Sequence, residues 1–146
     1  TMPLFREKEL AVMIEKAQIK IALCDVRLAD ELQSAKSDSM LEQVLLFGES
    51  ELEQMMSSKP ESFENYPSKA DDTCLIAFTS GTTGQPKGTM HFQRDMLTIC
   101  RAYSEPVLAP TPEDRFIGSP PLAFTFGLGG QLLFPMYARA STILLE

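Results

Sequence analysis

A glycine- and threonine-rich segment in the middle of the chain carries the residues best suited to chemistry, and from Thr79 to Gly88 it reads TSGTTGQPKG. A polyphosphate needs many donors at close range, and bulky side chains would keep it away from the backbone. Glycines leave backbone N–H groups free to curl around an anion, hydroxyls add donors, and a lysine adds a mobile positive charge. The segment therefore predicts a loop that binds phosphate groups.

The donors in this loop stand close together in the sequence. Its hydroxyl-bearing residues and glycines are Thr79, Ser80, Gly81, Thr82, Thr83, Gly84 and Gly88. Lys87 ends the loop, and Pro86 stiffens the turn before it. A Walker P-loop has glycine before its lysine and serine or threonine after it, so this is a different kind of phosphate loop. A flexible surface loop of the same composition is the alternative.

The elements that must position this loop begin with an alternation of helix and strand patterns. Apolar residues recur with helical spacing over residues 5–17, and a short strand over 19–23 follows. Asp25 is expected to cap the next helix, whose apolar face carries Leu28, Leu32 and Ala35. Each helix thus presents one apolar face to a neighbouring strand.

A continuous apolar run, Val44–Phe47, is typical of a parallel strand that is covered on both faces. Ser50 and Glu53 form the capping-box pattern of a further helix, in which Met55 and Met56 are expected to lie in the core. The alternation predicts an α/β fold with an open, mostly parallel sheet and helices on both faces.

A polar stretch divides the chain into an α/β part over 1–57, a surface linker over 58–72 and a phosphate-loop part over 73–146, within one partial domain. Pro106, Pro110 and Pro112 are expected to form a connection without helix. The other elements expected in the last part are strands over 73–78, 88–92 and 141–145 and helices over 93–103 and 127–137.

Composition narrows the class of function. The net charge of −7 disfavours nucleic acid and anionic lipid as partners. No apolar run approaches the roughly 20 residues that cross a bilayer, and the N-terminus lacks a signal pattern. Three separated cysteines and a single histidine provide no zinc site. Buried thiols in a reducing compartment are expected, which points to the cytoplasm.

The two ends of the sequence favour a piece of a larger protein. The chain begins at Thr1 and stops at Glu146, directly after an apolar strand pattern. An uncovered strand would expose an edge and an apolar face to other molecules. A complete small protein with a terminal edge strand is the alternative.

The order of residues from Thr79 to Gly88 resembles the AMP-binding signature of the adenylate-forming superfamily. That superfamily includes acyl-CoA synthetases, the adenylation domains of nonribosomal peptide synthetases, and luciferases. The rest of the chain is similar to the first two subdomains of the family's large N-terminal domain. The resemblance therefore covers most of the sequence and implies an incomplete copy of that domain.

This resemblance implies a reaction in two steps. A carboxylate attacks the α-phosphate of ATP to give an acyl-adenylate and pyrophosphate, and the thiol of CoA then displaces AMP to give a thioester. The loop would hold the β- and γ-phosphates together with Mg²⁺, with Lys87 as the catalytic charge. No protein ligand to the metal is expected within this chain.

A second segment, Pro121–Gly130, resembles the family's acyl-pocket motif, which typically reads Pro-Leu-Phe-His-x-x-Gly. Phe124 stands at the histidine position, which removes a polar group and adds aromatic surface. The residues expected to line an acyl pocket are Phe124, Thr125, Phe126 and Gly127. The alternative is that these phenylalanines only begin a core helix.

Two short sequences indicate the acid. The stretch PPLAFTFGLG and the GTMHF that follows Lys87 are most similar to ligases for benzoate or 2-aminobenzoate, so a small aryl carboxylate is the expected partner. His91 has no nearby nucleophile to activate, so a structural or hydrogen-bonding role is expected for it. The oligomeric state is left open.

Several parts of the family's catalytic apparatus do not occur in this sequence. They are the Tyr-Gly-x-Thr-Glu segment that meets Mg²⁺, the aspartate that binds ribose, a hinge, and the lysine of a small C-terminal domain. The chain alone is therefore expected to be inactive. Two other hypotheses remain open: a non-catalytic module that binds phosphate or nucleotide, and an adenylation domain that loads a carrier protein.

Overall fold

The computed structural model describes residues 4–37, 39–49, 51–79 and 86–145. The predicted Ser50 capping box and the loop residues from Ser80 to Gln85 lie outside these ranges. The chain divides into two compact units. Unit 1 consists mainly of Pro3–Pro67 and Phe78–Gly88, and unit 2 of Ser68–Ala77 and Thr89–Glu146.

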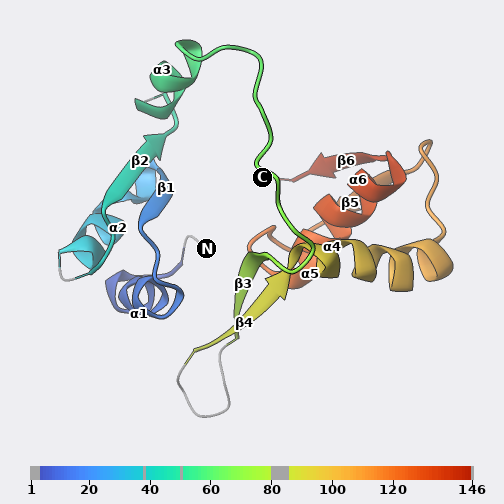
Figure 1. The fold of residues 1–146 in the computed structure, drawn as a ribbon, viewed down its shortest axis with the longest axis horizontal. Coiled ribbons are helices and arrows are strands. Elements are labelled where there is room, and N and C mark those ends of the chain that lie inside the picture. The colour runs from blue at the N-terminus through green and yellow to red at the C-terminus, as the bar shows by residue number, and fades with distance from the viewer. Residues whose placement is uncertain (1–3, 38, 50, 80–85, 146) are drawn as a thin grey trace. The chain divides into compact units, whose positions relative to one another are not determined.

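Unit 1 is built on two parallel strands (Figure 1). Helix α1, Glu7–Ala17, precedes strand β1, Ile21–Asp25, and a short 3₁₀ turn, η1, then leads into helix α2, Ala29–Lys36. Strand β2, Gln43–Phe47, pairs with β1 over its full length, with Leu23 opposite Leu45. Two parallel strands must be joined by a crossover connection, which α2 provides here. The predicted α/β class is confirmed.

The core of unit 1 lies on one face of this strand pair. Its buried residues are Ile14, Leu32, Ala35 and Leu41, with Ala22, Cys24 and Val44 packed against them. On the opposite face of β1, Ile21 and Leu23 are 58% and 62% exposed.

Local hydrogen bonds explain where the elements of unit 1 begin and end. Glu9 accepts a hydrogen bond from the backbone N–H of Arg6 at 3.1 Å, and α1 ends where Gln18 adopts a left-handed conformation. Asp25 accepts from the N–H of Arg27 at 2.9 Å and so caps η1 rather than the helix for which the cap was predicted, because Leu28 is the N-cap residue of α2. Glu53 of helix α3, Glu51–Ser57, accepts from the N–H of Gly48 at 2.8 Å.

One core prediction in unit 1 is wrong. Met55 and Met56 are 37% and 64% exposed and do not lie in the core. Helix α3 is only seven residues long, and none of its residues is buried. The hydrophobic pattern identified the helix, but a pattern cannot say whether another element lies against its apolar side.

The chain between α3 and the next strand has no helix or strand over residues 60–69. Strands β3, Thr73–Thr79, and β4, Lys87–Phe92, then form a two-stranded sheet of their own. Cys74 and His91 are joined across it, since the Cys74 thiol donates to the carbonyl of His91 at 3.5 Å.

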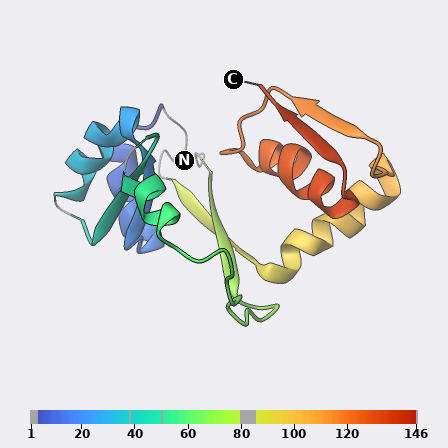
Figure 2. The same ribbon diagram turned by 90° about the horizontal axis from the view of Figure 1, so that it is seen from above.

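Unit 2 places a long helical segment beside a second parallel strand pair. Strands β5, Arg115–Gly118, and β6, Ser141–Leu144, run side by side with Ile117 opposite Ile143, and the second helical segment lies along them (Figure 2). The first helical segment consists of α4, Gln93–Ile99, and the π-helical η2, Cys100–Leu108; the second consists of α5, Thr125–Leu128, the π-helical η3, Gly129–Leu133, and α6, Phe134–Ala138.

The predicted helix-free connection at Pro106 is wrong, because the helical segment continues to Leu108 with this proline inside it. In an α-helix the proline ring would strike the carbonyl four residues earlier. The π-helical turn is wider and shifts the bonding pattern to i→i+5, which relieves that clash. The segment ends at Ala109, which is left-handed and donates its N–H to Ser104 at 2.9 Å.

None of the helices in the part of the chain that the structure describes is both long enough and apolar enough to cross a membrane.

Candidate functional site

The described ends of the predicted phosphate loop lie on two neighbouring strands. Thr79 is the last residue of β3, and Lys87 and Gly88 are the first residues of β4. All three are exposed to solvent. Because β3 and β4 are hydrogen-bonded neighbours, the chain leaves and re-enters the sheet at adjacent strands. The remaining predicted phosphate ligands, Ser80, Gly81, Thr82, Thr83 and Gly84, lie outside the described residues.

A second cation reaches the end of this loop from a distant part of unit 1. Lys16, in the last turn of α1, donates from Nζ to the carbonyl of Pro86 at 2.7 Å. This contact joins residues 70 positions apart in the chain. No local pattern in the sequence could have identified it, since Lys16 is an ordinary basic residue at a helix C-terminus.

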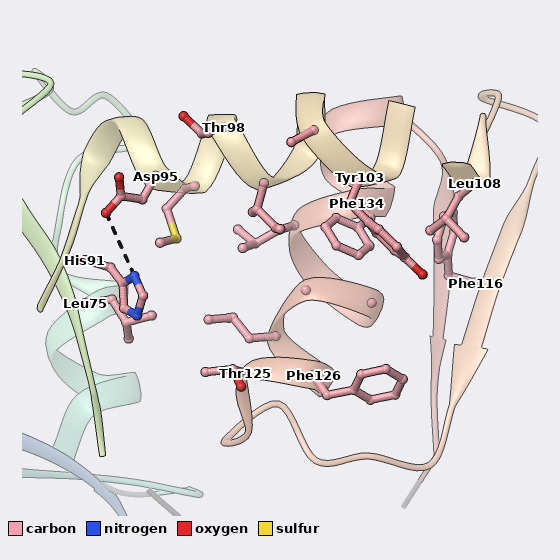
Figure 3. A pocket seen from close by; sticks show the side chains of 17 residues that line it. Leu75, His91, Asp95, Thr98, Tyr103, Leu108, Phe116, Thr125, Phe126 and Phe134 are labelled. Carbon is pink, nitrogen blue, oxygen red and sulfur yellow. Dashed lines mark ion pairs between the residues drawn. The ribbon is translucent and has the colours of Figure 1, made fainter. Parts of the chain in front are cut away.

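A cavity of about 830 Å³ lies within unit 2, between the two helical segments (Figure 3). Its wall is mostly apolar and aromatic, as is usual for sites that bind small organic molecules. The lining residues come from β3, β4, β5 and both helical segments, and the aromatic ones are Tyr103, Phe116, Phe126 and Phe134. Tyr103 and Phe134 lie with their ring centroids 5.8 Å apart.

The structure brings two of the four predicted acyl-pocket residues to this cavity. Thr125 and Phe126 line it, and the Phe126 side chain is 77% exposed. Phe124 and Gly127 are not among the lining residues. Gly127 instead is buried, and any Cβ there would collide with the carbonyl oxygen of Pro121, so its role is close packing.

Gly130 is a functional candidate that the sequence reasoning missed. It lines the cavity from η3, and a Cβ built on it would meet no atom within 4 Å. The space beside Gly130 is therefore open. The neighbouring Gly129 differs, because a Cβ built on it would lie 3.3 Å from the ring of Phe134. The signal available in the sequence was the pair Gly129–Gly130 inside a predicted helix, where glycine is unfavourable.

The cavity also has a polar end. His91 Nδ1 lies 3.9 Å from Asp95 Oδ2, an arrangement that is an ion pair whenever the imidazole is protonated. With the phenol of Tyr103, these are the ionisable side chains among the described lining residues. Asp95 also holds the start of α4, because its Oδ2 accepts from the backbone N–H of Phe92 at 2.8 Å.

A buried thiol connects the two walls of the cavity. Cys100 donates from Sγ to the carbonyl of Leu133 at 3.7 Å, which links η2 to η3. Burial raises the pKa of the Cys100 thiol, so the protonated form is favoured. A protonated thiol is a poor nucleophile, and Cys100 is therefore a packing residue.

Among the described residues, no cluster of three or more histidine, cysteine, aspartate or glutamate side chains is arranged to hold a metal ion. The groups that the structure offers to an anion are instead cationic: Lys87 on β4 and Lys16 at the Pro86 carbonyl.

Comparison with known proteins gives a consistent picture. A family model described as AMP-binding enzyme matches residues 1–146. The benzoate–CoA ligase of Thauera aromatica is 35% identical over 98 residues, which are 67% of this chain and 19% of that protein. The anthranilate–CoA ligase of Pseudomonas aeruginosa is 42% identical over 71 residues, which are 49% of this chain and 14% of that protein. Other relatives are ligases named for malonate and for long-chain fatty acids.

The crystal structure of the anthranilate CoA ligase AuaEII in complex with anthranoyl-AMP has the same fold over the whole chain. Its TM-score is 0.92 at 27% sequence identity, and the match covers 100% of this chain and 29% of that one. The chain therefore spans less than a third of the length of these proteins.

Proposed function

Because this chain belongs to the AMP-binding enzyme family, we propose that it forms part of an ATP-dependent acid–CoA ligase that acts on an aryl carboxylate. The observation that carries the choice of acid is the apolar cavity of unit 2, with Phe126 and Phe134 in its wall. Flat rings pack well against aromatic side chains, whereas a mostly apolar wall offers few favourable contacts to a short polar acid such as malonate.

In this proposal the reaction runs through an acyl-adenylate. The carboxylate oxygen bonds to the α-phosphorus of ATP while the bond to the β-phosphate oxygen breaks and pyrophosphate leaves. The thiol of CoA then bonds to the acyl carbon, AMP leaves, and one proton is released. Benzoate and 2-aminobenzoate are the acids that two of the similar ligases suggest.

The residues of the phosphate loop supply charge and donors in the first step. Lys87 would stabilise the negative charge that develops on the departing pyrophosphate. Thr79, with Ser80, Thr82, Thr83 and the backbone of Gly81, Gly84 and Gly88, would donate to the phosphate oxygens. Mg²⁺ would enter with ATP, because this ion is commonly bound through substrate phosphates with few protein ligands.

The fit of a triphosphate to this place is supported by charge. The whole chain carries −7, which would repel ATP, yet Lys16 and Lys87 both belong to unit 1 and both stand at the end of the loop. A local pair of cations offsets the unfavourable net charge at the point where phosphate must bind. We further propose that residues 1–146 alone do not turn over.

The test is ATP–pyrophosphate exchange that depends on a carboxylic acid, followed by thioester formation with CoA. It compares this chain with the full open reading frame that contains it, and both with Lys87→Ala. The acids are benzoate, 2-aminobenzoate, phenylacetate, malonate and a medium-chain fatty acid. We expect exchange by the longer form, strongest with an aryl acid, and a loss of about 100-fold in Lys87→Ala, the usual size for removing one group that stabilises developing charge.

Three outcomes would contradict parts of the proposal. Exchange that is strongest with malonate or the fatty acid would contradict the aryl substrate and would still support an acid–CoA ligase. Exchange by residues 1–146 alone would show that the inactivity prediction is wrong. A longer form that supports exchange with no acid would leave the loop as a binding site without this chemistry.

A further inference from the structure

The polar end of the unit 2 cavity has no part in the reaction as proposed so far. The carboxylate of the substrate must reach ATP, and the ring needs only an apolar wall, so neither group requires an ionisable pair inside the cavity. His91 and Asp95 nevertheless face it (Figure 3). Placing an apolar ring against such a pair is unfavourable, because polar groups lose water contacts there.

We propose that the His91–Asp95 pair makes this cavity select aryl acids that carry an amine or hydroxyl donor on the ring, a specificity that rests on the proposed aryl–CoA ligase function. Such a substituent would donate to the Asp95 carboxylate and lie beside the imidazole of His91. The predicted substrate class is therefore the aminobenzoates and hydroxybenzoates, with unsubstituted benzoate as a poorer substrate.

The geometry of the pair leaves it able to bind a further group. The 3.9 Å between His91 Nδ1 and Asp95 Oδ2 exceeds the length of a hydrogen bond between nitrogen and oxygen. Oδ2 accepts from the N–H of Phe92, and Arg94 Nε lies 4.0 Å from Oδ1. An ionised carboxylate has about four acceptor positions in all, so positions remain for a ligand donor. The side chains of His91 and Asp95 are 34% and 35% exposed, so a ligand can reach both.

The position of the pair within the cavity also fits a substituent rather than the carboxylate of the substrate. Asp95 is acidic and would repel a second carboxylate, whereas it attracts an N–H or O–H. Figure 3 places His91 and Asp95 at one end of the cavity and Leu108 and Phe116 at the other, with Phe126 between these ends. A ring against Phe126 can thus direct a substituent toward the polar end.

The size of the cavity supports a substituted ring. At about 830 Å³ it lies in the upper part of the range of roughly 300–1,000 Å³ that small-molecule sites occupy. A single unsubstituted ring would leave much of that space unfilled. An added amine, hydroxyl or fused second ring occupies more of it and can reach the wall formed by His91 and Asp95.

The test is the ratio of kcat/KM for a substituted acid to kcat/KM for benzoate, measured on the full open reading frame. The acids are benzoate, the three aminobenzoates and 2-hydroxybenzoate. The variants are Asp95→Asn, which keeps a side-chain oxygen for the Phe92 N–H, and His91→Phe, which keeps the size of the ring. The control is Asp71→Asn. Asp71 does not line the cavity and is 77% exposed, and it shares its partner Arg94 with Asp95, so this variant also tests whether an effect acts through Arg94.

We expect a ratio of at least about 10 for the best substituted acid in the parent protein, because a site that hydrogen-bonds its substrate discriminates against the analogue that lacks the donor. The ratio should fall toward 1 in Asp95→Asn and in His91→Phe and stay unchanged in Asp71→Asn. A role in folding alone would lower both activities together and leave the ratio unchanged. Melting temperatures of all variants identify any that fail to fold.

A second measurement needs no turnover. 2-Aminobenzoate is fluorescent, and its emission reports transfer into an apolar site, so its dissociation constant can be measured directly. We expect that constant to rise about 10-fold in Asp95→Asn and to stay unchanged in Asp71→Asn.

Each outcome decides between the two proposals. One result is that aryl acids are activated with a kcat/KM ratio of substituted acid to benzoate near or below 1, and another is a ratio that Asp95→Asn and His91→Phe do not change. Either result overturns the proposed selectivity and leaves the proposed aryl–CoA ligase function standing. Failure to activate or bind any aryl acid overturns both.

Discussion

At the scale of single residues, Gly130 is a helical glycine whose missing side chain leaves volume open in the cavity. A glycine inside a helix stabilises the fold less than an alanine does, by about 1 kcal/mol. A helical glycine at a position with room for a side chain therefore needs an explanation. Gly130 has no atom within 4 Å of its would-be Cβ and lines the cavity. Gly127 differs, because the Pro121 carbonyl excludes any side chain there. We therefore attribute Gly130 to the open volume and Gly127 to packing.

This distinction predicts opposite effects of two substitutions at one site. Gly130→Ala should raise the melting temperature by about 2–5 °C, since alanine removes backbone entropy from the unfolded chain. Gly130→Leu should fill part of the cavity and lower kcat/KM for benzoate or 2-aminobenzoate at least about 10-fold.

The measurements are thermal melting followed by circular dichroism and acid-dependent pyrophosphate exchange on the longer form. Gly130→Ala is the folding control for Gly130→Leu. Undiminished aryl activity in a folded Gly130→Leu variant would mean that the acid does not occupy this cavity.

At the scale of elements, unusual helical turns form the cavity. Both η2 and η3 are π-helical and both contribute lining residues, which include Ala102 and Tyr103 on one side and Gly130 and Leu133 on the other. π-Helical turns are rare and are frequently found at functional sites. No short sequence motif predicts that these turns wind as π-helix.

A different element, the turn between β1 and α2, predicts a dependence of stability on pH. Hydrogen bonds from the Arg27 side chain, at 2.8 and 2.9 Å, and from its backbone N–H lower the pKa of Asp25 from the ordinary 3.8 to about 2. A carboxylate whose folded pKa is lowered stabilises the fold above its unfolded pKa. That contribution is lost as the pH falls through the folded pKa.

We therefore expect the melting temperature of the chain to fall as the pH drops from about 4 to about 2, and to fall less in Asp25→Asn. The direct check is the pH titration of the Asp25 carboxyl carbon by NMR. A midpoint near the ordinary value of 3.8 would contradict the lowered pKa. Asp30→Asn, a carboxylate in the first turn of α2, is the matched control.

At the scale of the whole molecule, each parallel strand pair leaves apolar side chains open to solvent. In unit 1, Ile21 and Leu23 are more than half exposed, and in unit 2 the paired Ile117 and Ile143 are 62% and 46% exposed. Contiguous apolar patches and unpaired strand edges promote binding to other apolar surfaces. The buried hydrophobic residues are few by comparison, and unit 1 has four in its core cluster.

These surfaces predict that residues 1–146 bind the dye ANS and self-associate. Replacement of Leu23 and Ile117 by threonine should lower ANS fluorescence by about half and reduce association in sedimentation experiments, since it removes the most exposed apolar side chain of each parallel strand pair. Met136→Thr, a change of an exposed residue on α6, is the control. A chain that does not enhance ANS fluorescence would contradict this prediction.

By itself the sequence determined the α/β class, the order of most elements and the family. These follow from local information: the spacing of apolar residues and the order of residues from Thr79 to Gly88. Each depends on neighbours a few positions apart, so it can be derived without knowing how distant segments pack.

Only the tertiary structure decided which residues share a cavity. It brought Thr125 and Phe126 together with His91, Asp95 and the face of α4 and η2, and it placed Lys16 at the Pro86 carbonyl. It also removed Met55 and Met56 from the core and kept Pro106 within a helix. The physical reason is that burial and helix winding depend on what lies across the interface, and contacts between residues far apart in the chain leave no periodic trace in its sequence.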